Sequence, residues 1–236
     1  MRPSLETLLT IATTTACLCA LTLLTGCKDP KPDTDPTETT SAEPVKVKVI
    51  ALNDLHGHME GPSGKVKIGG ERVEAGGLDA MAAHLATLRE KNPNHVFVCA
   101  GDLVGASPLI SALFHDEPTV EAMNALGMDF VAVGNHEFDE GVDELLRLQN
   151  GGCHPEDGCQ GKDSFEGAKF SFLAANVIVK ETDKVLFPAY GIKEFGAVKV
   201  GFIGLTLEGT PDATSPAGVR TVKFLDEAET INKAAK

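Results

Sequence analysis

The segment 128–148 constrains the fold of this chain more than any other stretch. The apolar run 128–133 predicts a buried strand, and residues 143–148 show the apolar spacing of a helix. The turn between them contains Gly-Asn-His-Glu-Phe-Asp, in which an amide, an imidazole and a carboxylate fall within five residues. These groups are suited to binding a metal ion and to transferring a proton beside it. The unit therefore indicates an α/β fold with polar chemistry at a strand exit.

Two earlier strands are followed by side chains of the same kind. Residues 45–52 predict a strand that ends just before Asp54 and His56, and the run 96–100 predicts a strand that leads to Asp102. Ligands of open α/β sheets gather outside the carboxyl ends of the strands. Taken singly, Asp54 and His56 are ordinary turn residues, and Asp102 could be a helix N-cap or the start of an Asx-turn. Three such exits together indicate one metal site, in which a carboxylate can bridge two cations.

The other elements and the cysteines follow simpler patterns. The sequence predicts helices over 78–88 and 121–126 and strands over 170–179 and 197–205, and an acidic helix start follows at Asp226. Cys153 and Cys159 stand in a Gly-rich loop with His154 and acidic neighbours. Too few zinc-type ligands accompany them, so a local disulfide is favoured over a zinc site. Cys99 lies in an apolar strand and is expected to be a buried free thiol.

Composition narrows the class of partner. The chain has 236 residues, of which 42% are hydrophobic and 23% charged, as in an ordinary soluble globular protein. Its net charge of -13 and its lack of Trp argue against nucleic-acid binding, because phosphate backbones would be repelled and aromatic stacking surfaces are few. The acidity suits a cation site, although it also fits simple solubility.

The N-terminal region has the pattern of an export signal. An uncharged stretch over 8–24 leads into Leu-Thr-Gly-Cys, which resembles a bacterial lipobox, and in such signals the residue that matches Cys27 is lipidated. A plain transmembrane helix is the alternative, but about 17 apolar residues are short for one. We expect a lipoprotein signal peptide over 1–27, a disordered Pro/Thr/acid-rich linker over 28–44 and a domain over 45–236. The domain would then be held to a membrane by its N-terminal lipid, on the periplasmic or outer side of the cell envelope.

Three motifs carry a family resemblance. Residues 53–58 (Asn-Asp-Leu-His-Gly-His), 101–102 (Gly-Asp) and 134–139 (Gly-Asn-His-Glu-Phe-Asp) resemble, in order and spacing, the first three motifs of the calcineurin-like metallophosphoesterases. The closest match is the secreted 5′-nucleotidase branch, and the resemblance covers about residues 45–236. It implies two divalent ions, which could be Mn, Zn, Fe or Co. By this resemblance Asp54 and His56 bind one ion, Asp102 bridges both and Asn135 binds the second.

His136 and Asp139 complete the implied site. They are three residues apart and would share a helical face, so the carboxylate could orient the imidazole and stabilise its protonated form. An incidental surface pair is the alternative from spacing alone. The resemblance implies that His136 stabilises the phosphoryl transition state or protonates the leaving oxygen, with Asp139 as its dyad partner.

The chain departs from the family pattern after its third motif. In the family, later strands supply further His ligands and a C-terminal domain supplies nucleotide specificity, whereas no His follows His154 here. The expected fold is a metallophosphoesterase-type α/β/β/α sandwich, truncated before its second half. The implied function is hydrolysis of extracytoplasmic nucleotides or other phosphate esters. A cyclic-nucleotide phosphodiesterase, a nucleotide-sugar diphosphatase and a non-catalytic fragment or metal-binding lipoprotein remain as alternatives.

Overall fold

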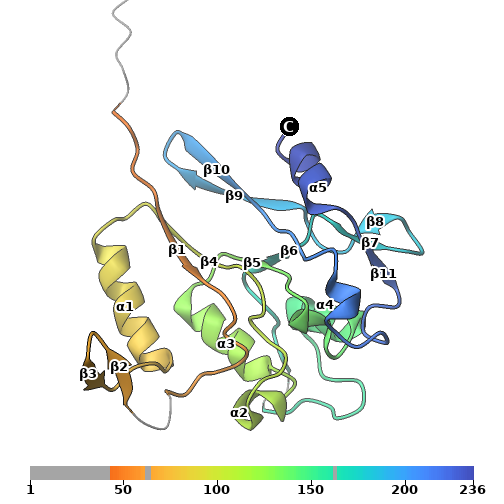
Figure 1. Ribbon diagram of the computed structural model, residues 1–236, viewed down its shortest axis with the longest axis horizontal. Coiled ribbons are helices and arrows are strands. Elements are labelled where there is room, and N and C mark those ends of the chain that lie inside the picture. The colour runs from red at the N-terminus through yellow and green to blue at the C-terminus, as the bar shows by residue number, and fades with distance from the viewer. Residues whose placement is uncertain (1–42, 62–64, 162–163) are drawn as a thin grey trace, which may run out of the picture. The chain divides into compact units, whose positions relative to one another are not determined.

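A computed structural model describes residues 43–61, 65–161 and 164–236 (Figure 1). The expected signal peptide, the lipidation site Cys27 and linker residues 28–42 lie outside the described residues. Within the described ranges, no helix has both the length and the apolar character needed to cross a membrane.

A parallel sheet organises the domain. Its strands lie side by side in chain order: β1 (Lys48–Leu52), β4 (His95–Cys99), β5 (Phe130–Ala132) and β6 (Ser171–Leu173). Parallel neighbours need long crossover connections. These contain α1 (Leu78–Glu90), α2 (Leu109–Ala112), α3 (Glu117–Leu126) and α4 (Val142–Asn150). The α/β class expected from the alternation of apolar runs and helical spacing is confirmed.

The core forms between the strands and these helices. In β4, three of the five residues are buried, including neighbours that point to opposite faces, as expected for a strand covered on both sides. The largest fully buried side chains include Phe97, Val131 and Phe172 from the parallel sheet and Val120, Met123 and Leu145 from α3 and α4. Gly127 ends α3 in the left-handed conformation (φ 66°), as expected for a C-terminal helix cap.

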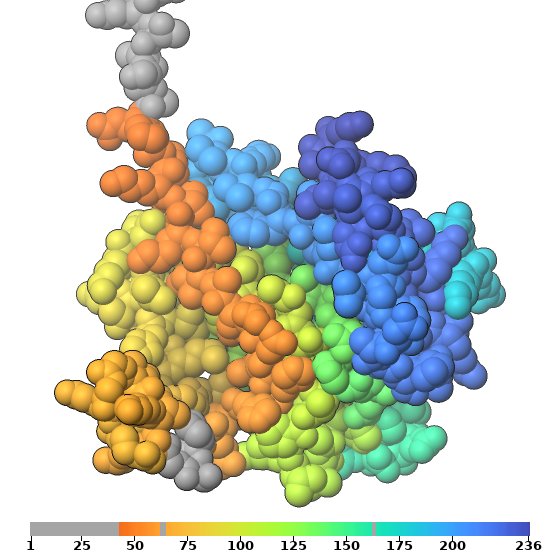
Figure 2. All heavy atoms as spheres, viewed as in Figure 1, coloured from red at the N-terminus to blue at the C-terminus, as the bar shows by residue number. Residues whose placement is uncertain are grey.

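The first strand lies at the edge of the parallel sheet. The residues of β1 alternate in exposure, although the run 49–52 is wholly apolar. Ile50 and Leu52 pack against the core, whereas Val49 is 54% exposed. Figure 2 shows the segment that contains β1, in orange, lying along the surface of the visible face. An apolar run thus marks a strand without telling whether one or both of its faces are covered.

Further strands form smaller sheets beside the parallel one. A three-stranded antiparallel sheet contains β11 (Val222–Phe224), β7 (Val177–Val179) and β8 (Lys184–Val185). Two antiparallel pairs join β9 (Tyr190–Phe195) to β10 (Val198–Ile203) and β2 (Val66–Ile68) to β3 (Glu71–Val73). The last helix is α5 (Glu227–Ala234), and Asp226 caps it by accepting a hydrogen bond from the Glu229 N–H at 2.7 Å. This confirms the helix start expected there.

The single strand expected over 170–179 is wrong. The run divides into β6 and β7, which belong to different sheets. Fully buried Asn176 lies between them, and its side chain bonds both the N–H and the carbonyl of Thr206 and the carbonyl of Leu225. These three hydrogen bonds satisfy the buried amide of Asn176 and prevent the segment from continuing as a single strand.

Candidate metal centre

The first two strand exits converge because β1 and β4 are paired in parallel register, with Leu52 opposite Cys99. The loops that follow remain in contact. The Asp54 N–H donates to the Gly101 carbonyl at 3.1 Å, and the His56 N–H donates to the Asp102 carbonyl at 3.0 Å. As a result, Asp54, His56 and Asp102 each place one ligand atom within 4.8 Å of the others. The structure therefore brings together three of the four side chains expected to bind metal.

The backbone at these three residues is strained. Asp54, His56 and Asp102 adopt φ values of 51°, 46° and 52°, in the left-handed region that L-residues other than Gly seldom occupy. Such conformations persist where the surrounding structure over-determines them, and they cluster at functional sites. Asp and His tolerate this region better than most residues do, and three of them together at one edge of the sheet mark a candidate functional site.

A backbone contact orients the His56 ring. Its Nδ1 lies 2.9 Å from the Gly105 carbonyl oxygen, which can only accept a hydrogen bond, so Nδ1 carries the proton. The other ring nitrogen, Nε2, is left as a ligand atom and lies 3.9 Å from Asp54 Oδ1. A metal-binding imidazole usually donates its other ring N–H to a carbonyl or a carboxylate in this way.

The third strand exit lies against the second. The His136 N–H donates to Asp102 Oδ1 at 3.0 Å, and the His136 ring meets the His56 ring edge-on with centroids 4.8 Å apart. Asn135 precedes His136 on the same loop. Its Nδ2 lies 3.4 Å from the Ala213 carbonyl, and an amide that donates through nitrogen keeps its oxygen as a metal-ligand atom.

His136 and Asp139 form a hydrogen-bonded pair. His136 Nδ1 lies 2.8 Å from Asp139 Oδ2, across the short 3₁₀ turn His136–Phe138. Asp139 is held by the Ala106 N–H and the Thr214 hydroxyl, both at 3.1 Å. The hydrogen bond to Asp139 raises the pKa of His136, and partial burial opposes it. Both side chains are about a third exposed, which leaves them within reach of a bound substrate.

Glu137 is a residue of this site that sequence reasoning missed. Its buried carboxylate accepts the backbone N–H groups of four residues on two strand exits: Asp102 at 3.0 Å, Leu103 at 2.6 Å, Val104 at 3.3 Å and Gly134 at 2.5 Å. Burial raises the pKa of Glu137 to about 7, and the N–H donors oppose this rise. Four donors aimed at two oxygens are matched to the ionised carboxylate. No local pattern marks this role, because three of the four donors lie more than thirty residues away.

The structure also places His58, His84 and the cysteines of the described residues. His58 is exposed, and its ring bonds the Leu55 and His56 carbonyls within its own loop. His84 lies exposed on α1. Cys153 and Cys159 form a disulfide with a Cα–Cα distance of 4.4 Å. Cys99 is a buried free thiol as expected, and burial raises its pKa to about 12.

A methyl group at Gly134 should disturb this site. A Cβ there would overlap Asp102 Oδ1 and press on the Asp102 backbone nitrogen. We expect Gly134→Ala to lower the free energy of unfolding of the metal-free protein by about 1–3 kcal/mol, because well-packed positions resist added atoms. Urea denaturation measures the change. Gly201→Ala is the matched control, since a Cβ at Gly201 meets no atom within 4 Å. Equal losses in the two variants would contradict the close approach.

Comparisons with known proteins agree with this geometry. The family model described as "Calcineurin-like phosphoesterase" matches residues 47–228. An uncharacterised protein of Acinetobacter calcoaceticus, encoded in the pqq-V 5′ region, is 45% identical over 190 residues that cover 76% of this chain and 93% of that protein. Endonuclease YhcR of Bacillus subtilis is 39% identical over 201 residues, 84% of this chain and 16% of the relative.

A solved structure also matches this chain, over part of its own length. The NAD nucleotidase of Haemophilus influenzae aligns with a TM-score of 0.65 and 29% identity, over 81% of this chain and 31% of that one. Relatives named as 5′-nucleotidases match with 28% to 34% of their own length covered. The chain therefore spans almost all of one relative and about a third or less of these others.

Proposed function

The chain belongs to the calcineurin-like phosphoesterase family, and on that basis we propose that it is a metal-dependent phosphoric ester hydrolase that acts on nucleotides outside the cytoplasm. The observation that carries the proposal is the meeting of Asp54, His56 and Asp102 within 4.8 Å at the carboxyl ends of two parallel strands. Relatives named as 5′-nucleotidases support the nucleotide assignment.

We assign the metal ligands from the family resemblance, which the contacts of the side chains support. Asp54 and His56 would hold one divalent ion, Asp102 would bridge to a second, and Asn135 would bind that second ion through its amide oxygen. Carboxylate, amide and imidazole donors suit Mn, Zn, Fe or Co. A pair of such ions, when bound, polarises a phosphoryl group and lowers the pKa of water.

We assign the role of proton donor to His136. Its Nδ1 is tied to Asp139, so Nε2 is the ring atom that can face a substrate. A carboxylate partner stabilises the imidazolium, which can donate a proton to the leaving alkoxide or a hydrogen bond to the phosphoryl oxygens. Asp139 would fix the ring orientation, since the Ala106 N–H and the Thr214 hydroxyl hold its own oxygens.

The proposed location rests on two features. Leu-Thr-Gly-Cys at 24–27 has the lipobox pattern of a bacterial lipoprotein. The Cys153–Cys159 disulfide belongs in an oxidising compartment, such as the periplasm or the cell surface. Both features support an exported, lipid-anchored protein.

A substrate panel tests the proposal. Protein stripped with a chelator and reloaded with Mn²⁺ or Zn²⁺ is incubated with 5′-AMP, 3′,5′-cyclic AMP, UDP-glucose or single-stranded DNA. We expect metal-dependent phosphate release from 5′-AMP, because that ester matches the 5′-nucleotidase relatives. Faster turnover of the cyclic ester, the diphosphate or the DNA would reassign the substrate. If no substrate is turned over with any metal, the non-catalytic alternative is favoured.

A further inference from the structure

A second group of metal-ligand side chains lies in a different part of the chain from the candidate metal centre. His115 stands in the turn between α2 and α3, and His154 and Asp157 belong to the loop closed by the disulfide. Each of the three places one ligand atom within 4.8 Å of the others. His115 Nε2 lies 2.9 Å and His154 Nδ1 lies 3.6 Å from Asp157 Oδ2. We call these three residues the His115 cluster.

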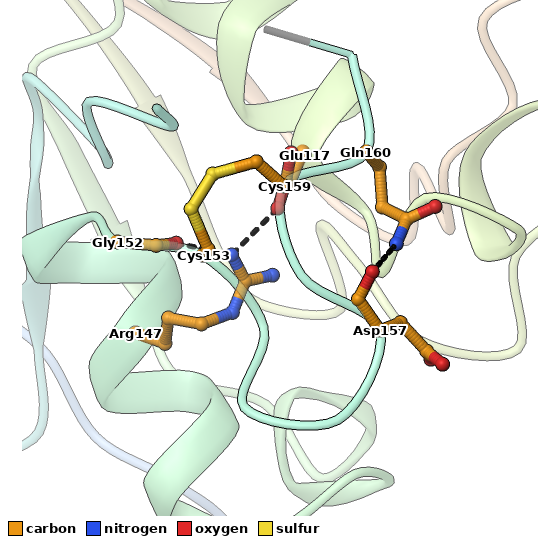
Figure 3. Close-up of a disulfide and its surroundings, with 7 residues drawn as sticks. All are labelled: Glu117, Arg147, Gly152, Cys153, Asp157, Cys159 and Gln160. Carbon is orange, nitrogen blue, oxygen red and sulfur yellow. Dashed lines mark hydrogen bonds and ion pairs between the residues drawn. A yellow bond between two sulfur atoms is a disulfide. The ribbon is translucent and has the colours of Figure 1, made fainter. Parts of the chain in front are cut away.

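The loop that supplies two of these side chains is held in shape by several contacts (Figure 3). Within the disulfide ring, His154 and Gly158 exchange two backbone hydrogen bonds of 3.1 and 2.9 Å. Gln160 donates to the Asp157 carbonyl at 2.7 Å. At the start of the loop, the buried Arg147 guanidinium bonds the Gly152 carbonyl at 2.8 Å and Glu117 at 2.6 Å. The backbone that carries His154 and Asp157 is thus held before any ligand binds.

The protons in the cluster can be assigned from its hydrogen bonds. His115 Nδ1 lies 2.9 Å from Glu140 Oε2, and an ionised carboxylate only accepts, so Nδ1 carries a proton. His154 Nδ1 accepts the N–H groups of Glu156 and Asp157 at 3.4 and 3.2 Å, so it is unprotonated. The lone pair of this nitrogen points at those two N–H groups, and the Asp157 carboxylate oxygen lies 3.6 Å away, so an ion bound by His154 Nδ1 would replace the two long N–H contacts. A cation is needed among these atoms, either a proton on His115 Nε2 or a metal ion.

The spacing fits a metal ion. In a tetrahedral zinc site with bonds of about 2.0–2.1 Å, neighbouring ligand atoms are about 3.3 Å apart. The two measured edges, 2.9 and 3.6 Å, lie on either side of that value. The His115 and His154 rings are stacked at 3.8 Å with 5° between their planes. Parallel rings share no in-plane point, so one ring has to rotate about its Cβ–Cγ bond for both nitrogen lone pairs to meet at one ion. The Asp157 side chain is 59% exposed, which gives an ion a path from solvent.

We propose that His115, His154 and Asp157 bind one divalent transition-metal ion of the zinc type, with Glu140 orienting His115 from behind. Two imidazoles and one carboxylate are a common zinc donor set, and a carboxylate on the far nitrogen is the usual second partner of a zinc-bound imidazole. The ion would join the disulfide loop to the α2–α3 turn. Because Glu140 follows Asp139, it would also steady the turn that carries the His136–Asp139 pair. This site does not depend on the proposed hydrolase activity.

Counting bound zinc tests the proposal. The metal-free chain is dialysed against Zn²⁺, and the bound metal is measured by elemental analysis. We expect His154→Asn to bind one ion fewer per chain than the unmodified protein, and Asp157→Asn to do the same. His84→Asn is the matched control, because His84 lies exposed on α1; it should bind the full number. Asp102→Asn should retain one ion, held by the His115 cluster.

A spectroscopic measurement covers the case of a misfolded variant. Co²⁺ added to the Asp102→Asn chain should give the visible absorption of a tetrahedral site, and the further change His154→Asn should abolish it. Glu140→Ala should weaken zinc binding about 10–100-fold while leaving the number of ions unchanged. Equal zinc counts in His154→Asn and His84→Asn would overturn the proposal. A His115 ring that keeps protons on both nitrogens in the presence of Zn²⁺, seen by NMR, would also overturn it.

Discussion

Replacing Asp102 with Asn should lower kcat/KM for the best phosphate ester by about 10³-fold or more, which corresponds to about 4 kcal/mol of transition-state stabilisation. The amide has one coordinating oxygen and no charge, so it cannot bridge two cations as a carboxylate can. The His136 N–H now donates a hydrogen bond to Asp102 at 3.0 Å. The oxygen of the introduced amide would still accept that hydrogen bond. The change therefore removes charge while the local fold is kept.

Steady-state kinetics with added Mn²⁺ measure this effect, and metal analysis of the same samples shows whether ions are lost. Asp143→Asn is the matched control, because Asp143 is exposed in the first turn of α4. It removes one negative charge without touching the strand exits. An Asp102→Asn protein that keeps a tenth or more of the activity and its full number of ions would show that Asp102 does not bridge metals.

Replacing Glu137 with Gln should lower the free energy of unfolding of the metal-free protein by about 3 kcal/mol. The four backbone N–H groups that now share an ionised carboxylate would face a neutral amide with one acceptor and two donors. At least one buried N–H would lose its partner, and each such loss costs about 1–3 kcal/mol. The NH₂ group of the introduced Gln would also face backbone N–H groups, which places donor against donor.

Urea denaturation at about pH 8.5, above the raised pKa of Glu137, measures this change. The matched control is Glu90→Gln at the exposed end of α1, for which we expect a change within about 0.5 kcal/mol. A loss below about 1 kcal/mol in Glu137→Gln would show that water or a shift of the loops replaces the carboxylate. In that case the hydrogen bonds of Glu137 would not be what holds the two strand exits together.

The strands that carry the candidate site could be predicted because each is an apolar run followed at once by polar residues. Asp54, His56 and Asp102 were expected at strand exits, and parallel pairing of β1 with β4 brings them together. What the sequence could not show is how firmly they are held. The left-handed backbone at these residues depends on contacts between loops that lie far apart in the chain.

The elements that the sequence did not predict depend on contacts that their local sequence does not show. The strand β9 contains Gly191, Lys193 and Glu194, all weak strand formers, and its pairing with β10 overrides their preference. Gly191 is placed there because the Phe130 ring fills the space that a side chain would need. The run 170–179 looked continuous because Asn176, its one break, has partners that come from residues 206 and 225. Glu137 and His115 likewise acquire their roles mainly from residues that are distant in the chain.

The left-handed φ values at Asp54, His56 and Asp102 also bear on how long the protein stays folded. Each such residue costs of order 1–3 kcal/mol, so the metal-free chain holds this edge in a conformation that its own peptide units oppose. Ions bound there would act as folding ligands, whose contribution rises with their free concentration. Scarcity of the metal in the surroundings would then shorten the lifetime of the protein as well as slow its reaction.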